Sequence, residues 1–251
     1  MKNRIDIFGV GFDSLTRREL CTRLSGMLAK GKGQYVVTPN PEIIEYSIKD
    51  SEYRKILCEA DLCIADGVGV IYASKLFNTP IKERIPGIEA GEMMLCLAAK
   101  REERVYFLGG EDGVAKTAAE KLRVKYPSLK IVGAHHGYFT EDENQKVIDE
   151  INETEATILF VCMGYPRQEK WIYDNISDLH SVKVAMALGG SLDVYSGNVK
   201  RAPALFCSLG LEWLWRGICL PGHFSRLKPL RRFAYRSIVH KCKTVKNKNR
   251  R

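Results

Sequence analysis

This 251-residue sequence lacks several features that would identify a membrane, secreted or zinc-binding protein. No run of about 18 uninterrupted apolar residues occurs, which argues against a membrane-spanning helix. The charged start has only a short apolar run, broken by Asp6 and Asp13, so it predicts no signal peptide. The eight cysteines contain no Cys-x-x-Cys pair, which argues against a structural zinc site. We therefore expect a reduced, cytoplasmic chain whose cysteines are mostly small core residues.

Catalytic signatures are also scarce. There is no Asp-x-Asp pair to hold a divalent ion against a diphosphate, and no Gly-x-Ser-x-Gly elbow that would predict a serine hydrolase. The turn from Phe107 to Gly113 is glycine-rich, so a phosphate can approach backbone N–H groups near Gly109 and Gly110. Its spacing and its place in the chain differ from the dinucleotide fingerprint. His135 and His136 lack a third ligand at suitable spacing, so we predict no metal site and no cofactor.

Positive charge is abundant, and it is concentrated at the end of the chain. The formal net charge is +9, and residues 213–251 hold 12 of the 39 Lys and Arg and no acidic residue, which leaves 27 basic and 30 acidic residues elsewhere. A basic surface on a slightly acidic body favours an anionic partner, such as membrane phosphate, nucleic acid or a phosphorylated substrate. Apolar residues from Phe224 to Ile238 recur at spacings of three and four, between arginines. This pattern is typical of a membrane-surface helix, and it fits equally a helix that docks on the body and keeps its arginines in water.

The rest of the chain has ordinary globular composition, with 45% hydrophobic and 27% charged residues. Apolar strands alternate with helices through short connections, which predicts an α/β fold with a Rossmann-like, doubly wound and mostly parallel sheet. No further strand is expected beyond residue 204. We therefore predict a core of residues 1–204 and a basic, amphipathic, helical C-terminal appendage of residues 205–251. The expected strands are 5–10, 35–37, 62–65, 105–108, 131–134, 157–163 and 182–188.

Polar or small residues follow five of the expected strands. Thr38 and Asn40 follow one strand and Asp66 follows the next. Ligands of open parallel sheets bind beyond the carboxyl ends of the strands, so these three side chains can share one crevice. The alternative is structural: Thr38 and Asn40 cap a helix, and Asp66 opens a turn. The other candidates at strand ends are Gly109, Gly110, Met163, Gly164, Gln168, Glu169, Gly190 and Asp193, and Arg201 lies at the junction with the tail. For residues 163–169 the alternative is an ordinary helix start.

Seven motifs occur along the chain in one order. They are Thr38-Pro-Asn-Pro-Glu42, Ala65-Asp-Gly67, Glu83-Arg-Ile-Pro-Gly87, Phe107-Leu-Gly-Gly110, Met163-Gly-x-Pro-x-Gln-Glu169, Gly189-Gly-x-x-Asp193 with Ser196-Gly-x-x-x-Arg-Ala-Pro203, and Gly210-Leu-Glu-Trp-Leu-Trp-Arg216. Together they resemble the TagA/WecG/CpsF glycosyltransferase family. The resemblance covers nearly all of the chain up to about Arg236.

The resemblance implies an inverting enzyme that moves a sugar from a UDP donor to a lipid-linked acceptor at the cytoplasmic face of the cell membrane. In the TagA branch the donor is UDP-N-acetylmannosamine and the acceptor is undecaprenyl-diphosphate N-acetylglucosamine, an early step of wall teichoic acid synthesis. Other branches serve capsular or exopolysaccharides with other donors, such as UDP-N-acetylmannosaminuronate or UDP-glucose. By the same resemblance Asp66 is the catalytic base. The supporting polar residues are Thr38, Asn40, Arg84 and Gln168, and the appendage with Arg216 completes the site and touches the membrane.

Two other classes remain as alternatives. A nucleotide-binding oxidoreductase needs the fingerprint that is missing here. A nucleic-acid-binding protein would use the basic tail, but aromatic residues at helical spacing are more typical of an apolar helix face than of a stacking platform. We therefore expect a UDP-sugar, a lipid-linked acceptor and the inner membrane surface as partners, and no nucleic acid. Association into a homo-oligomer stays an open alternative.

Overall fold

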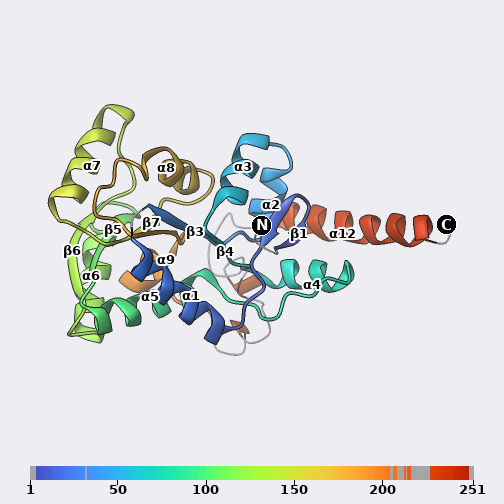
Figure 1. Cartoon of the computed structure of the whole chain (residues 1–251), viewed down its shortest axis with the longest axis horizontal. Helices are drawn as coiled ribbons and strands as arrows, with labels where there is room; N and C mark the ends of the chain where they lie inside the picture. Colours follow the sequence, from blue (N-terminus) through green and yellow to red (C-terminus); the bar gives the residue numbers. More distant parts are fainter. Residues whose placement is uncertain are drawn as a thin grey trace.

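The centre of the molecule is a six-stranded sheet in which all neighbouring strands are parallel, in the order β4-β3-β8-β7-β5-β6 (Figure 1). The computed structural model describes residues 4–31, 33–203, 206–207, 212, 214–215 and 227–248. The predicted α/β class with a Rossmann-like parallel sheet is therefore confirmed. The strands are β3 (Gln34–Val37), β4 (Leu62–Cys63), β5 (Arg104–Gly109), β6 (Lys130–His135), β7 (Ile158–Cys162) and β8 (Val184–Ala187).

Helices cover both faces of this sheet (Figure 1). Successive residues of a strand point to opposite faces, so Val36 and Val37 belong to two separate hydrophobic clusters. All residues of β7 and β8 are buried, as in parallel strands covered on both sides. One cluster holds side chains of α1 (Arg17–Lys30), α5 (Gly87–Arg101), α6 (Val114–Lys125) and α9 (Ser191–Ser196). The other holds those of α2 (Pro41–Ser47), α3 (Ser51–Glu59), α4 (Val68–Leu76), α7 (Asn144–Glu153) and α8 (Arg167–Asn175), with η1 (Glu141–Glu143) just before α7.

The prediction of one strand over residues 5–10 is wrong. These residues contribute to an antiparallel ribbon of β1 (Ile5–Ile7) and β2 (Val10–Phe12), separate from the main sheet. Phe8 and Gly9 connect the two strands with φ angles of 56° and 86°. Tight two-residue hairpin turns need such positive φ angles. The turn escaped prediction because its first position is a phenylalanine instead of the usual asparagine, aspartate or glycine.

The expectation that most cysteines are core residues is also wrong for the part of the chain that the structure describes. Only Cys63 and Cys162 of the described cysteines are buried, whereas Cys21, Cys58, Cys96 and Cys242 are exposed. The exposed four lie on helices, where burial depends on which face a residue occupies and not on whether its sequence neighbours are apolar. At the end of β7, burial raises the pKa of the Cys162 thiol to about 12, so this group stays protonated.

The C-terminal helix α12 (Leu227–Lys248) packs on α2 and α4 (Figure 1). Phe233 is buried against Phe8, with the ring centroids 5.6 Å apart and the rings nearly perpendicular. Nearby, Arg236 Nε donates a hydrogen bond to Glu45 Oε1 at 2.9 Å. The docking interpretation is therefore correct for this face of the helix. No described helix, α12 included, is long and apolar enough to cross a membrane.

Replacing Phe233 by alanine is expected to loosen α12 from the body. The change removes a buried aromatic ring, which typically costs about 3 to 5 kcal/mol. Hydrogen–deuterium exchange of the α12 amides should therefore rise, while exchange in β7 and β8 stays as in the parent protein. Tyr235→Ala on the outward face of the same helix is the matched control, with an expected effect below about 0.5 kcal/mol. Equal α12 exchange in the two variants would contradict this packing.

Candidate functional site

The connections that follow β4, β3, β8, β7 and β5 all leave the same edge of the sheet, because these neighbouring strands are parallel. The chain goes from β3 into α2 on one face and from β8 into α9 on the other face. In open α/β sheets, ligands bind where adjacent connections separate in this way. The five strand ends named from the sequence therefore do meet at one edge.

Asp66 lies at the beginning of α5. Its Oδ2 accepts a hydrogen bond at 3.3 Å from the backbone N–H of Gly87, the first residue of α5, whereas the N-cap residue Pro86 provides no side-chain hydrogen bond. A Cβ at position 87 would lie 2.9 Å from Thr38 Oγ1, so the missing side chain of Gly87 allows the helix to approach the end of β3. The positive end of α5 thus faces the ends of β3 and β4, where it favours a carboxylate.

Thr38 and Asn40 each have a structural task in this arrangement. Thr38 Oγ1 donates to the carbonyl oxygen of Ala187 at 3.0 Å and so joins the ends of β3 and β8. Asn40 Oδ1 accepts hydrogen bonds from two backbone N–H groups in the first turn of α2. The helix-cap interpretation is therefore correct for Asn40 and wrong for Thr38. Asn40 still lies beside the turn that carries Asp66, because a Cβ at Gly67 would be 3.6 Å from the Asn40 Cβ.

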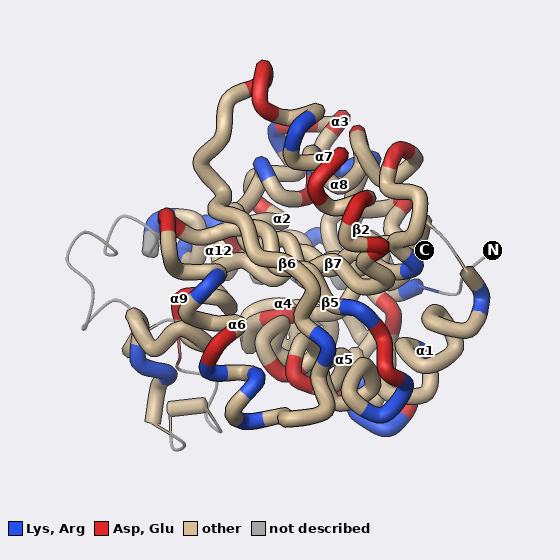
Figure 2. Tube along the Cα trace, turned by 90° about the vertical axis from the view of Figure 1, so that its left-hand side faces the viewer, with Lys and Arg blue, Asp and Glu red and all other residues tan. Residues whose placement is uncertain are grey.

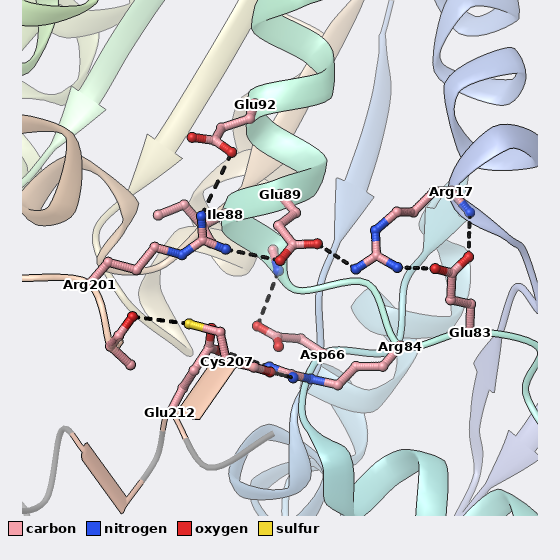
Figure 3. A network of polar contacts seen from close by, with 12 residues as sticks. Arg17, Asp66, Glu83, Arg84, Ile88, Glu89, Glu92, Arg201, Cys207 and Glu212 are labelled. Atoms are coloured by element: carbon pink, nitrogen blue, oxygen red, sulfur yellow. Dashed lines mark hydrogen bonds and ion pairs between the residues drawn. The ribbon is translucent and has the colours of Figure 1, made fainter. Parts of the chain in front are cut away.

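Arg84, on the segment that leads into α5, binds the C-terminal part of the chain (Figure 3). Its Nη1 donates to the carbonyl oxygen of Cys207 at 2.9 Å, and its Nη2 pairs with Glu212 Oε2 at 2.8 Å. The Arg84 side chain is 17% exposed, and its buried Nε has no hydrogen-bond partner among the described residues. Glu212 belongs to the seventh sequence motif, but its pairing with Arg84, 128 positions away, was not predicted.

A second group of charges surrounds the first turn of α5 (Figure 3). Glu89 accepts from Arg17 at 2.6 Å and from Arg201 at 2.9 Å, and Arg17 also pairs with Glu83. Arg201 is therefore near the start of α5, as a site residue should be, but its charge is partly neutralised by Glu89. Nothing in the sequence indicated that Arg17 lies near this site, because its partner Glu89 is 72 positions away.

The glycine-rich turn after β5 packs closely against the backbone of neighbouring turns. The N–H of Gly110 donates to the carbonyl oxygen of Cys162 at 3.2 Å, and the N–H of Gly137 donates to the carbonyl oxygen of Gly110 at 2.8 Å. A Cβ at Gly109 would lie 2.3 Å from that same Cys162 oxygen. Gly109 and Gly110 therefore allow close packing of three turns, and the Gly110 N–H is already occupied by protein.

The turn after β7 holds four of the sequence candidates. Met163 packs against the core, and a Cβ at Gly164 would meet nothing within 4 Å, so open space borders this turn. Gln168 and Glu169, in the first turn of α8, are 2% and 1% exposed. The Gln168 amide bonds to Glu169 on one side and to the N–H of Gly189 on the other, at 2.7 and 2.9 Å. In this structure Gln168 thus holds a neighbouring turn.

The turn after β8 carries the last candidates. Gly190 lies just before α9 and Asp193 in the first turn of that helix, and a Cβ at Gly190 would be 3.4 Å from Asp193 Oδ2. Arg216 lies outside the described residues. Within the described ranges, no group of three or more His, Cys, Asp or Glu side chains is arranged to hold a metal ion. His135 and His136 contact each other instead, with ring centroids 4.4 Å apart and the rings tilted by 37°.

Comparison with known proteins connects this site to a family. The sequence model of the glycosyl transferase WecG/TagA/CpsF family matches residues 5–247. The N-acetylglucosaminyldiphosphoundecaprenol N-acetyl-beta-D-mannosaminyltransferases of Staphylococcus aureus strains MRSA252 and NCTC 8325 / PS 47 are each 34% identical to the chain over 247 residues. These matches cover 98% of this chain and 96% of each relative. The chain therefore belongs to the WecG/TagA/CpsF family and is a glycosyltransferase.

Proposed function

We propose that the protein transfers N-acetylmannosamine from UDP-N-acetylmannosamine to N-acetylglucosamine carried on undecaprenyl diphosphate. The sugar and the acceptor are those named for the Staphylococcus aureus relatives, which match nearly the whole chain. The structural observation that carries the proposal is Asp66 at the positive end of α5, with Thr38 and Asn40 beside it. The reaction would be an early step of teichoic acid linkage, performed at the inner face of the cell membrane.

In this proposal Asp66 acts as the general base. The acceptor hydroxyl gives its proton to the Asp66 carboxylate while its oxygen attacks the anomeric carbon of the donor. The bond between that carbon and UDP breaks, and its electron pair leaves on the diphosphate. A single displacement of this kind inverts the anomeric carbon. Arg84 supplies positive charge to the departing UDP, and because no Asp-x-Asp pair is present we expect activity without a divalent ion.

A donor screen tests the proposed function. UDP release is measured with several UDP-sugars and a short-chain lipid-diphosphate acceptor, with and without EDTA. The highest kcat/KM is expected for UDP-N-acetylmannosamine, with EDTA leaving the rate unchanged. A higher value for UDP-N-acetylmannosaminuronate or UDP-glucose would instead place the protein in capsular or exopolysaccharide synthesis. Loss of UDP release in EDTA would contradict metal independence.

In the same assay, Asp66→Asn is expected to lower kcat by roughly two to four orders of magnitude, the usual contribution of a positioned base. The amide keeps the size of the side chain and an oxygen that can accept from Gly87, but it takes up no proton. Calorimetric UDP affinity and the melting temperature should stay near the parent values, which separates a catalytic loss from a folding defect. Parent-like turnover would remove Asp66 from the mechanism and leave it as a turn residue.

Arg84→Ala is expected to weaken UDP binding or slow UDP departure by on the order of 2 kcal/mol or more, because a diphosphate loses its charged partner. The substitution also breaks the contact with Glu212, so Glu212→Gln is the matched control. That variant loosens the C-terminal segment while it keeps the guanidinium, and UDP affinity should be retained or rise. Equal losses of turnover and UDP affinity in the two variants would show that Arg84 only holds the segment.

The outward face of α12 suits the proposed membrane contact. Tyr235 and Ile238 are 71% and 58% exposed, and Arg231 and Arg232 are exposed on the same helix. The helix sequence contains eight Lys or Arg and no Asp or Glu, whereas both signs are interspersed over the face of the body in Figure 2. Exposed aromatic and aliphatic side chains among cations are typical of helices that bind anionic bilayers. Arg236 contributes less here, since it is paired with Glu45.

The double variant Arg231→Gln, Arg232→Gln is expected to bind anionic liposomes more weakly than the parent. Each surface cation contributes about 1 kcal/mol, so the loss is about 2 kcal/mol, or roughly 30-fold in sedimentation assays. High salt should weaken the parent in the same way. The control is Lys116→Gln, Lys146→Gln, which removes the same charge from exposed positions on α6 and α7. Equal weakening by the two double variants would point to net charge alone and contradict a specific role of α12.

A further inference from the structure

Two adjacent polar side chains at the start of α8 are buried, and the proposed mechanism uses neither of them directly. Gln168 is 2% exposed and Glu169 is 1% exposed. Burial raises the pKa of the Glu169 carboxyl group above its ordinary value, so keeping this group inside costs free energy. A cost of this kind is expected where a polar group organises a site.

The hydrogen bonds define the direction of the Gln168 amide. The backbone N–H of Gly189 can only donate, so the atom that faces it at 2.9 Å is the carbonyl oxygen Oε1. The Nε2 group then points to the other side and donates to Glu169 Oε1 at 2.7 Å. With the amide turned around, its NH₂ group would face the Gly189 donor, and one buried hydrogen bond would be lost. Glu169 thus selects the orientation that holds Gly189.

The turn held in this way borders the candidate site. Gly189 follows β8, whose end is joined to β3 by the hydrogen bond from Thr38 to Ala187. A Cβ on Gly189, or on Gly164 in the turn after the neighbouring strand β7, would meet nothing within 4 Å. The backbone of both turns therefore faces open space, where a nucleotide or a sugar can approach closely.

Aromatic residues surround the other side of Glu169. Tyr53 of α3 is fully buried, with Tyr46 and Tyr165 nearby. Burial is the largest cause that raises the pKa of the Tyr53 hydroxyl, and the charge of Glu169 is the second. Tyr53 Oη and Glu169 Oε2 are close enough to influence each other's pKa, but neither makes a well-formed hydrogen bond to any described residue. The next cation along α8, Lys170, is paired with Asp50. A neutral carboxyl group fits these surroundings, because burial disfavours the charged form and no described cation is among the groups that shift the pKa of Glu169.

We propose that Glu169 is a positioning residue for sugar transfer: through the Gln168 amide it holds the Gly189 turn in the shape that the substrates meet. It acts as a neutral hydrogen-bond acceptor and does not touch the substrates. The test by kcat/KM rests on the proposed function. Hydrogen exchange of the Gly189 amide can be measured whichever sugar the protein transfers.

Three variants of the full chain test this proposal. Glu169→Leu removes the acceptor oxygens and keeps a side chain of similar size. Glu169→Gln keeps an acceptor oxygen without a charge. Thr154→Val is the matched control, because it removes one side-chain hydrogen bond at the end of α7, next to the amino-terminal end of β7. The measurements are kcat/KM with the best donor of the parent protein, and NMR hydrogen exchange of the Gly189 amide.

For Glu169→Leu we expect kcat/KM to fall about ten-fold, the effect of one lost hydrogen bond, and Gly189 exchange to rise. Glu169→Gln and Thr154→Val should match the parent in both measurements. A loss of activity without faster Gly189 exchange would overturn the proposal, because the effect would not pass through the turn. An equal loss in Glu169→Gln would also overturn it, since the charge would then be required. If no donor is turned over at all, the proposed function fails and the Gly189 exchange still decides this inference.

The melting temperatures of the parent and of Glu169→Gln, compared over a range of pH, test whether Glu169 is neutral in the fold. This test does not require Glu169→Leu to fold. A carboxyl group with a raised pKa binds its proton more tightly in the folded chain than in the unfolded chain. Its contribution to stability is therefore complete at low pH and is lost as the pH rises through the folded pKa. From about pH 5 to about pH 8, the melting temperature of the parent should fall relative to that of Glu169→Gln. A constant difference would show that Glu169 is ionised in the fold and would overturn its neutral role.

Discussion

The approach of α5 to the ends of β3 and β4 is the contact on which the candidate site depends. The N-cap residue Pro86 provides no side-chain hydrogen bond, so the first N–H of the helix binds Asp66, and the missing side chain of Gly87 lets Thr38 lie against the helix start. A side chain at position 87 would separate these groups. The same contact puts the carboxylate in the positive field of the helix terminus, where a negative charge is stabilised.

Several groups that the sequence marked as ligands serve the fold in this structure. Asn40 caps α2, the N–H of Gly110 binds a neighbouring turn, and the amide of Gln168 spans from Glu169 to Gly189. Groups tied in this way keep their places without a ligand, and such preorganisation lowers the cost of aligning substrates. The chemistry is then left to fewer side chains, of which Asp66 is the candidate base and Arg84 the candidate cation.

One face of the helix α12 docks on the body, and its other face suits the proposed membrane contact. Its inner face docks through Phe233 and through the ion pair of Arg236 with Glu45, while its outer face keeps Tyr235 exposed among cations. The docking partner α2 is capped by Asn40, which lies beside the turn of Asp66. One short helix therefore joins the surface proposed to meet the membrane to the end of the sheet where the sugar is proposed to be transferred.

Local patterns were enough to predict the strand and helix alternation, the parallel sheet and the meeting of five strand ends. Buried strands such as β7 are short apolar runs and helices show one apolar face, and both signals lie within a few neighbouring residues. The Phe8–Gly9 hairpin turn, the burial of Glu169 and the partners of Arg84 and Arg236 were beyond such patterns. Those partners, Glu212 and Glu45, lie 128 and 191 positions away. A local pattern reports which face of an element avoids water, whereas the partner of a polar side chain depends on how distant segments pack against each other.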